Sequence, residues 1–207
     1  CWKGDIVAVY TQNFGWSIML LQHKATFVIK ELLDIISVST FAEFSKRLNK
    51  YASKQDPDVY DPLKYKGDGF EVFAEFFFKF FNGDHTLTYT SDYEPNGDYD
   101  NGIDGGGRCT FGGDNVVQVK YKSDPTKYLT NEDNISNVVA AALGQGLVPN
   151  FKMKNVVVIT SCKGIHRNHA MIPAHCINRE QIARRVDKNV VFWSDFKSVV
   201  KESLETY

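Results

Sequence analysis

The stretch Gly102-Ile103-Asp104-Gly105-Gly106, followed by Val116-Val117-Gln118-Val119-Lys120, decides the fold. In the second segment valines alternate with polar residues, which predicts a strand. We expect Ile103 and Asp104 to end one strand and Gln118 to Lys120 to lie on the next, so that a hairpin brings the two together. Gln118 and Lys120 are two positions apart, so their side chains point to one face of the sheet. A carboxylate, an amide and an ammonium are therefore predicted to converge.

This set of side chains suits the hydrolysis of a phosphodiester bond. Asp104 offers Mg²⁺ a carboxylate oxygen, and the Gln118 side-chain carbonyl and the Val119 backbone carbonyl are candidate further ligands. Such a metal polarises the phosphate and lowers the pKa of a bound water. Lys120 is suited to orient that water or to stabilise charge on the phosphate. Glu71 or Glu75, from a helix predicted over 70–81, is placed to complete the metal shell.

The surrounding sequence mixes helices with strands, which is typical of an α/β sheet with helices on its faces. Helices are expected after the Ser39-Thr40 cap, over 70–81, over 134–143 and from Ser194 to Leu204. Strands are expected over 86–89, 116–122, 155–160 and 189–193. The turn-rich stretch from Asp56 to Pro62 separates an N-terminal accessory lobe, 1–62, from a core, 63–207.

Five pieces of the core, in this order, resemble the Mrr-type branch of the PD-(D/E)xK nuclease superfamily, which has the restriction-endonuclease-like fold. They are Gly69-Phe70-Glu71, Gly102-Ile103-Asp104-Gly105, Gln118-Val119-Lys120, the helix over 134–143 and the strand Val156-Val157-Val158-Ile159-Thr160. The resemblance covers roughly residues 66 to 205. Two departures matter: Gln118 stands in place of a second acidic ligand, as in the Mrr branch, and residues 1–65 have no counterpart.

The resemblance implies an αβββαβ core, with a mixed sheet flanked by helices, and divalent-metal-dependent cleavage of DNA. It implies Asp104, Gln118 and Lys120 as catalytic residues, and Glu71 matches the helical glutamate of the family. The expected cofactor is Mg²⁺, with Mn²⁺ as a substitute. The metal ligands would come from Asp104, Gln118, Val119 and Glu71. The expected partner is DNA, bound by a homodimer or by a larger nuclease–helicase assembly.

Positive charge is concentrated in the second half of the chain. Residues 101–207 carry 14 Lys and Arg against 10 Asp and Glu, whereas residues 1–100 carry 10 against 15. The second half is therefore the expected surface for an anionic partner. The side chains proposed to contact DNA are those of Lys122, Lys163, Arg167, Arg184 and Arg185.

Cysteine and histidine crowd into one segment, which contains Cys162, His166, His169, His175 and Cys176. Nitrogen and sulfur donors at this density suggest zinc, although the spacing matches no standard zinc finger. Two other readings stay open. Lys163 and Arg167, with His166, would face phosphate, or the segment is a solvated loop.

Composition narrows the class of protein. The 207 residues, 43% hydrophobic and 24% charged, indicate one globular domain with or without an extra lobe. No apolar run is long enough to predict a membrane span. Four scattered cysteines without a CxxC pair favour a reduced, cytoplasmic protein, in a bacterial or virus-infected cell. Cys1 as the first residue suggests a trimmed fragment or, alternatively, a processed lipoprotein.

Rival functions remain open at this point. One is a catalytically silent nuclease fold that only binds DNA or assembles a complex, which the glutamine at 118 and the modest net charge favour. Another is a nuclease selective for branched DNA, or the nuclease domain of a larger helicase–nuclease. Cleavage assays on linear and branched DNA discriminate among them.

Overall fold

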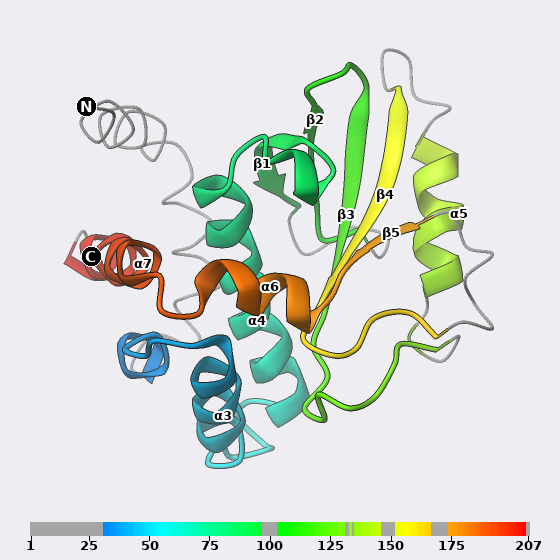
Figure 1. Cartoon of the computed structure of the whole chain (residues 1–207). Coiled ribbons are helices and arrows are strands. Elements are labelled where there is room, and N and C mark those ends of the chain that lie inside the picture. The colour runs from blue at the N-terminus through cyan, green and yellow to red at the C-terminus, as the bar shows by residue number, and fades with distance from the viewer. Residues whose placement is uncertain are drawn as a thin grey trace, which may run out of the picture.

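The computed structural model describes residues 31–96, 103–130, 133, 135–145, 152–166 and 174–205 (Figure 1). Five strands form one mixed sheet in the order β1-β2-β3-β4-β5. Their bounds are β1 Thr90–Pro95, β2 Gly105–Cys109, β3 Asp114–Lys120, β4 Met153–Thr160 and β5 Ala174–Ile177. Strand β2 runs antiparallel to both β1 and β3, and β4 and β5 run parallel to β3.

Helices cover both faces of the sheet, as expected for an α/β fold. They are α3 Phe41–Ala52, α4 Pro62–Phe80, α5 Ile135–Gln145, α6 Arg179–Val186 and α7 Val190–Glu205. Figure 1 shows α5 alone on one side, with α3, α4, α6 and α7 on the other. From α4 to β4 the order is helix, three strands, helix, strand, with only a short 3₁₀ turn, η2 His85–Leu87, added. None of the helices within the described ranges is both long and apolar enough to cross a membrane.

The main core is built from phenylalanines on α4. Phe73 lies at its centre, with ring centroids 5.1 Å from Phe41 and 4.9 Å from Phe44, both on α3. Phe76 stacks on Phe196 of α7 at 4.6 Å. Burial of these rings is the largest favourable contribution to the fold. Because α3 shares this core, residues 31–52 of the predicted accessory region pack directly against the predicted nuclease-like core.

The predicted helices over 70–81 and 134–143 are confirmed, and so is the helix after Ser39-Thr40. Thr40 caps α3 by accepting a hydrogen bond from the Glu43 amide at 3.2 Å. Helix α4 starts well before residue 70. The Asp61 side chain caps it and Pro62 occupies its first turn, so the end of the turn-rich stretch is a helix start.

The strand predicted over 86–89 is wrong. The Asp84 side chain accepts from the Thr86 amide at 2.7 Å and holds the 3₁₀ turn η2. Thr88 and Tyr89 then adopt left-handed backbone conformations, with φ of 64° and 55°. Local hydrogen bonding by the aspartate therefore outweighs the strand propensity of the threonines, and β1 begins only at Thr90.

The strand predicted over 189–193 is also wrong, because these residues start α7. The Asn189 side chain accepts from the Phe192 amide at 3.1 Å, so the helix begins before the predicted Ser194 cap. Val190 and Val191 are exposed, whereas Phe192 and Phe196 are buried at helical spacing. The sequence patterns predicted neither β5 nor α6, although Asn178 and Gln181 form a capping box at the start of α6.

Gly107 gives the most direct test of the sheet. A Cβ at this position would lie 2.6 Å from the Ser91 carbonyl oxygen and 2.8 Å from the Thr90 methyl carbon. Gly107→Ala is therefore expected to lower the free energy of unfolding by about 1–3 kcal/mol in urea titrations. Gly67→Ala is the control, because nothing lies near its Cβ. It should raise that free energy by about 0.5–1 kcal/mol, since alanine favours helix. Equal effects of the two changes would contradict the register of β1 and β2.

Candidate functional site

The candidate site lies where β2 begins and β3 ends. The paired part of the two strands stops at Gly105 and Val117. Asp104 immediately precedes β2, and its amide donates to the Val117 carbonyl oxygen at 3.1 Å. The prediction that Ile103 and Asp104 end a strand is therefore wrong. The convergence with β3 is nevertheless present, because in an antiparallel hairpin the start of one strand faces the end of the other.

The Asp104 carboxylate lies at the end of the paired part of β2 and β3. Its Oδ2 accepts a hydrogen bond from the Val119 amide at 2.6 Å and another from Gln118 Nε2. A carboxylate that accepts two hydrogen bonds is held in one orientation, and hydrogen bonds to its charged form favour that form. The side chain is also nearly buried, with 9% of its surface exposed.

Asp104 fixes the orientation of the Gln118 amide. The carboxylate accepts hydrogen bonds, so the amide must turn its NH₂ group toward Asp104, which leaves the carbonyl oxygen facing elsewhere. That oxygen, Oε1, is buried and has no hydrogen-bond partner within the described residues. Buried acceptors are normally satisfied by protein or by ordered water, so this oxygen is available to a water or to a metal ion. The Val119 carbonyl oxygen lies 3.5 Å from the same Gln118 Nε2.

Lys120 is the last residue of β3 and is partly exposed. Its carbonyl oxygen accepts from the Thr160 hydroxyl at 2.8 Å and from the Ser161 amide at 3.4 Å, which fixes the end of the strand against β4. By strand alternation its side chain lies on the same face as that of Gln118, as predicted.

The faces of β3 show how the site is divided between the two sides of the sheet. Val117 and Val119 belong to the core shared with α4. Val116 packs with Val139 of α5. Gln118 and Lys120 alternate along β3 with Val117 and Val119, so their side chains lie on the face of the sheet that α5 covers. Glu71 belongs to α4, on the other face, so it reaches the site only around the end of the sheet.

Tyr93 of β1 links the carboxylates of α4 to Asp104. Its phenol is buried and stacks on Phe78 with ring centroids 5.0 Å apart. Burial, together with the negative charges of Glu75, Asp104 and Glu71, raises the pKa of Tyr93 well above its ordinary value. The three carboxylates therefore act electrostatically on one phenol, which stays protonated. Tyr93 lies outside the motifs that predict the site, and its sequence context suggests an exposed aromatic available to contact DNA, whereas the residue is buried.

Glu71 and Glu75 occupy different environments. Glu75 is 3% exposed and forms an ion pair with Lys79, four residues later on α4. Glu71 is partly exposed. A buried, paired carboxylate is held in place by the cost of breaking its ion pair. Of the two, Glu71 is the side chain more accessible to solvent.

The donor set decides which metal the site fits. Within the described residues, no group of three or more His, Cys, Asp or Glu side chains is arranged to hold a metal ion. The corner instead offers one carboxylate and two carbonyl oxygens, from Asp104, Gln118 and Val119. Mg²⁺ is commonly bound by only one or two carboxylates and completes its shell with water and phosphate oxygens. These residues therefore fit Mg²⁺ better than zinc.

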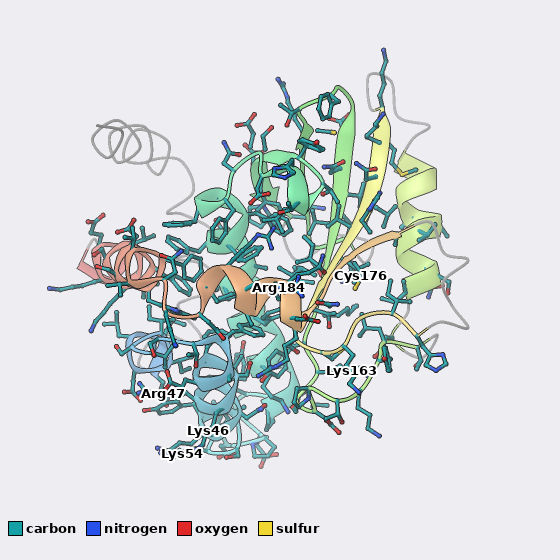
Figure 2. All side chains as sticks on the ribbon, in the orientation of Figure 1. Lys46, Arg47, Lys54, Lys163, Cys176 and Arg184 are labelled. Atoms are coloured by element: carbon teal, nitrogen blue, oxygen red, sulfur yellow. The ribbon has the colours of Figure 1, made fainter. Side chains whose placement is uncertain are left out.

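Three of the residues predicted to contact DNA form ion pairs with acidic side chains. Lys122 pairs with Asp133 at 2.5 Å, and exposed Arg184 pairs with Glu180. Arg185 is largely buried beside Asp84, with Nε 3.6 Å from the carboxylate. Lys163 and Arg184, both labelled in Figure 2, lie near each other, because Glu180, the partner of Arg184, lines a pocket together with Lys163. Arg167 lies outside the described residues.

Lys163 is the predicted DNA contact that lines an open pocket. Its ammonium lies 5.6 Å from the centre of the Tyr128 ring. The pocket, about 240 Å³ in volume, is also lined by Asn178, Arg179 and Glu180 at the start of α6. The residues that line this pocket are distant in sequence from Asp104. They include both positively and negatively charged side chains.

Cys176 of the predicted zinc segment lies in surroundings that favour the protonated thiol. Burial raises the pKa of the Cys176 thiol to about 11. Cys162 is fully buried, and its sulfur lies 3.2 Å from the Thr160 hydroxyl. Zinc binds thiolates, which such surroundings disfavour. His169 lies outside the described residues.

Comparison with known proteins adds no relative to this description. No protein-family model, curated protein or solved structure matches the chain significantly. The proposed function therefore rests on the geometry of the Asp104 corner and on the order of the helices and strands around it.

Proposed function

We propose that this chain is a Mg²⁺-dependent DNA endonuclease with a restriction-endonuclease-like core. The observation that carries the proposal is the pair of hydrogen bonds by which Asp104 joins Val119 and Gln118 at the end of β3. The order of α4, β1, β2, β3, α5 and β4, with β4 parallel to β3, supports the αβββαβ core. Hydrolysis of a phosphodiester bond is the reaction that this combination of groups suits best.

Each residue has a distinct role in this proposal. The metal would be held by the Asp104 carboxylate, the orphan Oε1 of Gln118 and the Val119 carbonyl. When bound, Mg²⁺ supplies positive charge that polarises the phosphate and acidifies a water. The Asp104–Val119 hydrogen bond sets the carboxylate in place before DNA arrives, which avoids reorganisation during the reaction.

Lys120 supplies positive charge that belongs to the protein itself. Its ammonium can donate three hydrogen bonds, either to a non-bridging phosphate oxygen or to the attacking water. Stabilising the charge that develops on the phosphate lowers the barrier of the reaction. Glu71 is proposed to position water or metal from the α4 side.

The test is cleavage of supercoiled plasmid by the full chain in Mg²⁺, Mn²⁺, or EDTA. We expect nicked or linear product with Mg²⁺ and with Mn²⁺, and none in EDTA. Four-way-junction and linear duplex substrates, run in parallel, would show whether branched DNA is preferred. Equal cleavage in EDTA, or no cleavage of any substrate with either metal, would overturn the proposal.

One observation favours a second function, a DNA-binding module that does not cleave. The described residues place no three acidic, histidine or cysteine side chains around one point, and nucleases that hold two metals need more carboxylates. This alternative predicts DNA binding that is the same in Mg²⁺ and in EDTA, with intact plasmid in both. Metal-dependent cleavage would exclude it.

A further inference from the structure

A row of lysines follows the outer face of α3. Lys46, Lys50 and Lys54 are four residues apart, so they lie above one another on the helix, with Lys54 just beyond its last residue. All three are exposed, whereas the opposite face, with Phe41, Phe44, Leu48 and Ala52, is buried in the core. Figure 2 shows Lys46 and Lys54 on the outer side of α3. These three residues are called the α3 lysine stripe.

The stripe is not neutralised by nearby carboxylates. None of the ion pairs among the described residues involves its lysines. Asp34 is held by Arg47 and by the Tyr51 hydroxyl, and Glu43 accepts from the Ser39 amide and hydroxyl. Like charges four residues apart destabilise a helix, so the stripe opposes the stability of α3. Such repulsion between like charges is expected on a surface that binds an anion.

An aromatic ring reinforces the stripe. The ammonium groups of Lys50 and Lys54 lie 5.8 Å and 5.1 Å from the centre of the Tyr51 ring. Cation–π contacts of this type hold the lysine side chains along the helix surface. In the turn that follows α3, the Asp56 carboxylate accepts from the Asp58 amide at 3.0 Å.

One hydrogen bond fastens this helix to the residue that follows β3, and another fastens it to α6. Ser45, the neighbour of Lys46, accepts through its carbonyl from the Tyr121 hydroxyl at 3.2 Å. Tyr121 directly follows Lys120 in the chain. The Ser45 hydroxyl also accepts from Arg179 at 3.4 Å. Helix α3 therefore packs against the residue that follows Lys120, on the face of the sheet opposite the Lys120 side chain.

We propose that the α3 lysine stripe binds the phosphate backbone of double-stranded DNA that enters the candidate site. The proposal rests on the proposed function, because that function makes the anion DNA. Four helical residues advance about 6 Å, and two nucleotides of one strand advance about 7 Å, so successive lysines can meet every second phosphate of one strand. Contacts of this kind carry no base specificity and depend strongly on salt.

The test compares two triple variants of the full chain in binding to a fluorescent duplex, in EDTA so that nothing is cleaved. Lys46→Gln/Lys50→Gln/Lys54→Gln should weaken binding at least about tenfold at low salt. It should also reduce the slope of log affinity against log salt by about 2–3, because three phosphate contacts are lost. Glutamine favours helix about as well as lysine, so the thermal midpoint should not fall.

The control is Lys152→Gln/Lys154→Gln/Lys197→Gln, which removes the same charge from exposed lysines on β4, just before it, and on α7. It should bind within about twofold of wild type, with a salt slope reduced by less than about one. Equal losses in the two variants, or wild-type binding by the stripe variant, would overturn the proposal. So would a stripe variant that loses binding to phosphatidylserine vesicles but keeps its affinity for DNA.

The two proposals fail in different ways. Wild-type protein that binds DNA through the stripe in EDTA but never cleaves it would overturn the proposed function and support the stripe. Metal-dependent cleavage, together with DNA binding that ignores the stripe variant, would overturn the stripe and leave the proposed function standing.

Discussion

Asp104→Asn is expected to lower the rate of metal-dependent DNA cleavage at least about a hundredfold. The carboxylate is the single charged ligand in the proposed metal corner, and asparagine removes that charge. The asparagine side-chain oxygen can still accept from the Val119 amide, which lies 2.6 Å from Asp104 in the wild type. The variant should therefore fold, and the loss should reflect chemistry.

The measurement is the single-turnover cleavage rate of an end-labelled duplex at saturating protein. Asp114→Asn is the matched control, because this aspartate sits at the other end of β3 and accepts from the Lys152 amide at 3.0 Å. It should keep a rate close to that of wild type. Cleavage by Asp104→Asn within about threefold of wild type would place the active site elsewhere.

The choice of asparagine rather than alanine matters at this position. Alanine would leave the buried Val119 amide and Gln118 Nε2 without their common acceptor. Unsatisfied buried donors cost about 1–3 kcal/mol each, so a loss of activity in Asp104→Ala would mix catalysis with unfolding.

Lys120→Met should also lower the cleavage rate at least about a hundredfold, with little change in DNA affinity. Methionine keeps an unbranched stem of similar length but carries no charge. The proposed role of Lys120 is to stabilise charge that develops on the phosphate, so its loss should appear in the rate at saturating protein.

Lys122→Met is the control for this second change. Lys122 lies two residues further on, and its ammonium pairs with Asp133 at 2.5 Å, so its charge is already balanced. Its removal should leave the cleavage rate within a few-fold of wild type. Equal cleavage rates for Lys120→Met and the wild type would show that Lys120 takes no part in catalysis.

Much of the site could be predicted from the sequence because its signals are local. Glycines beside Asp104 and alternating valines around Gln118 predict a hairpin, and the period of two places Gln118 and Lys120 on one face. The cap at Thr40 predicts α3 for the same reason, since its hydrogen bond to Glu43 spans only three residues. Each of these features depends on neighbours in the chain.

The remaining features depend on contacts between distant residues. Asn189 to Trp193 contains β-branched residues that suit a strand, yet burial of Phe192 against α4 makes them helical. Tyr93 lies near the carboxylates of Glu71, Glu75 and Asp104 because β1 pairs with β2 and packs against α4. The ion pair that occupies Lys122 forms with Asp133, from the segment before α5. Tertiary context decides these cases, and no single-sequence pattern contains it.

The most direct test of the central claim is Mn²⁺ binding to the Asp104 corner, measured by electron paramagnetic resonance. Wild-type protein and Asp114→Asn should each bind one ion in a metal titration. Asp104→Asn should lose that site, and Gln118→Leu should weaken it by removing the orphan Oε1. A wild-type protein that binds no Mn²⁺, or an Asp104→Asn variant that binds it as tightly as wild type, would contradict the account.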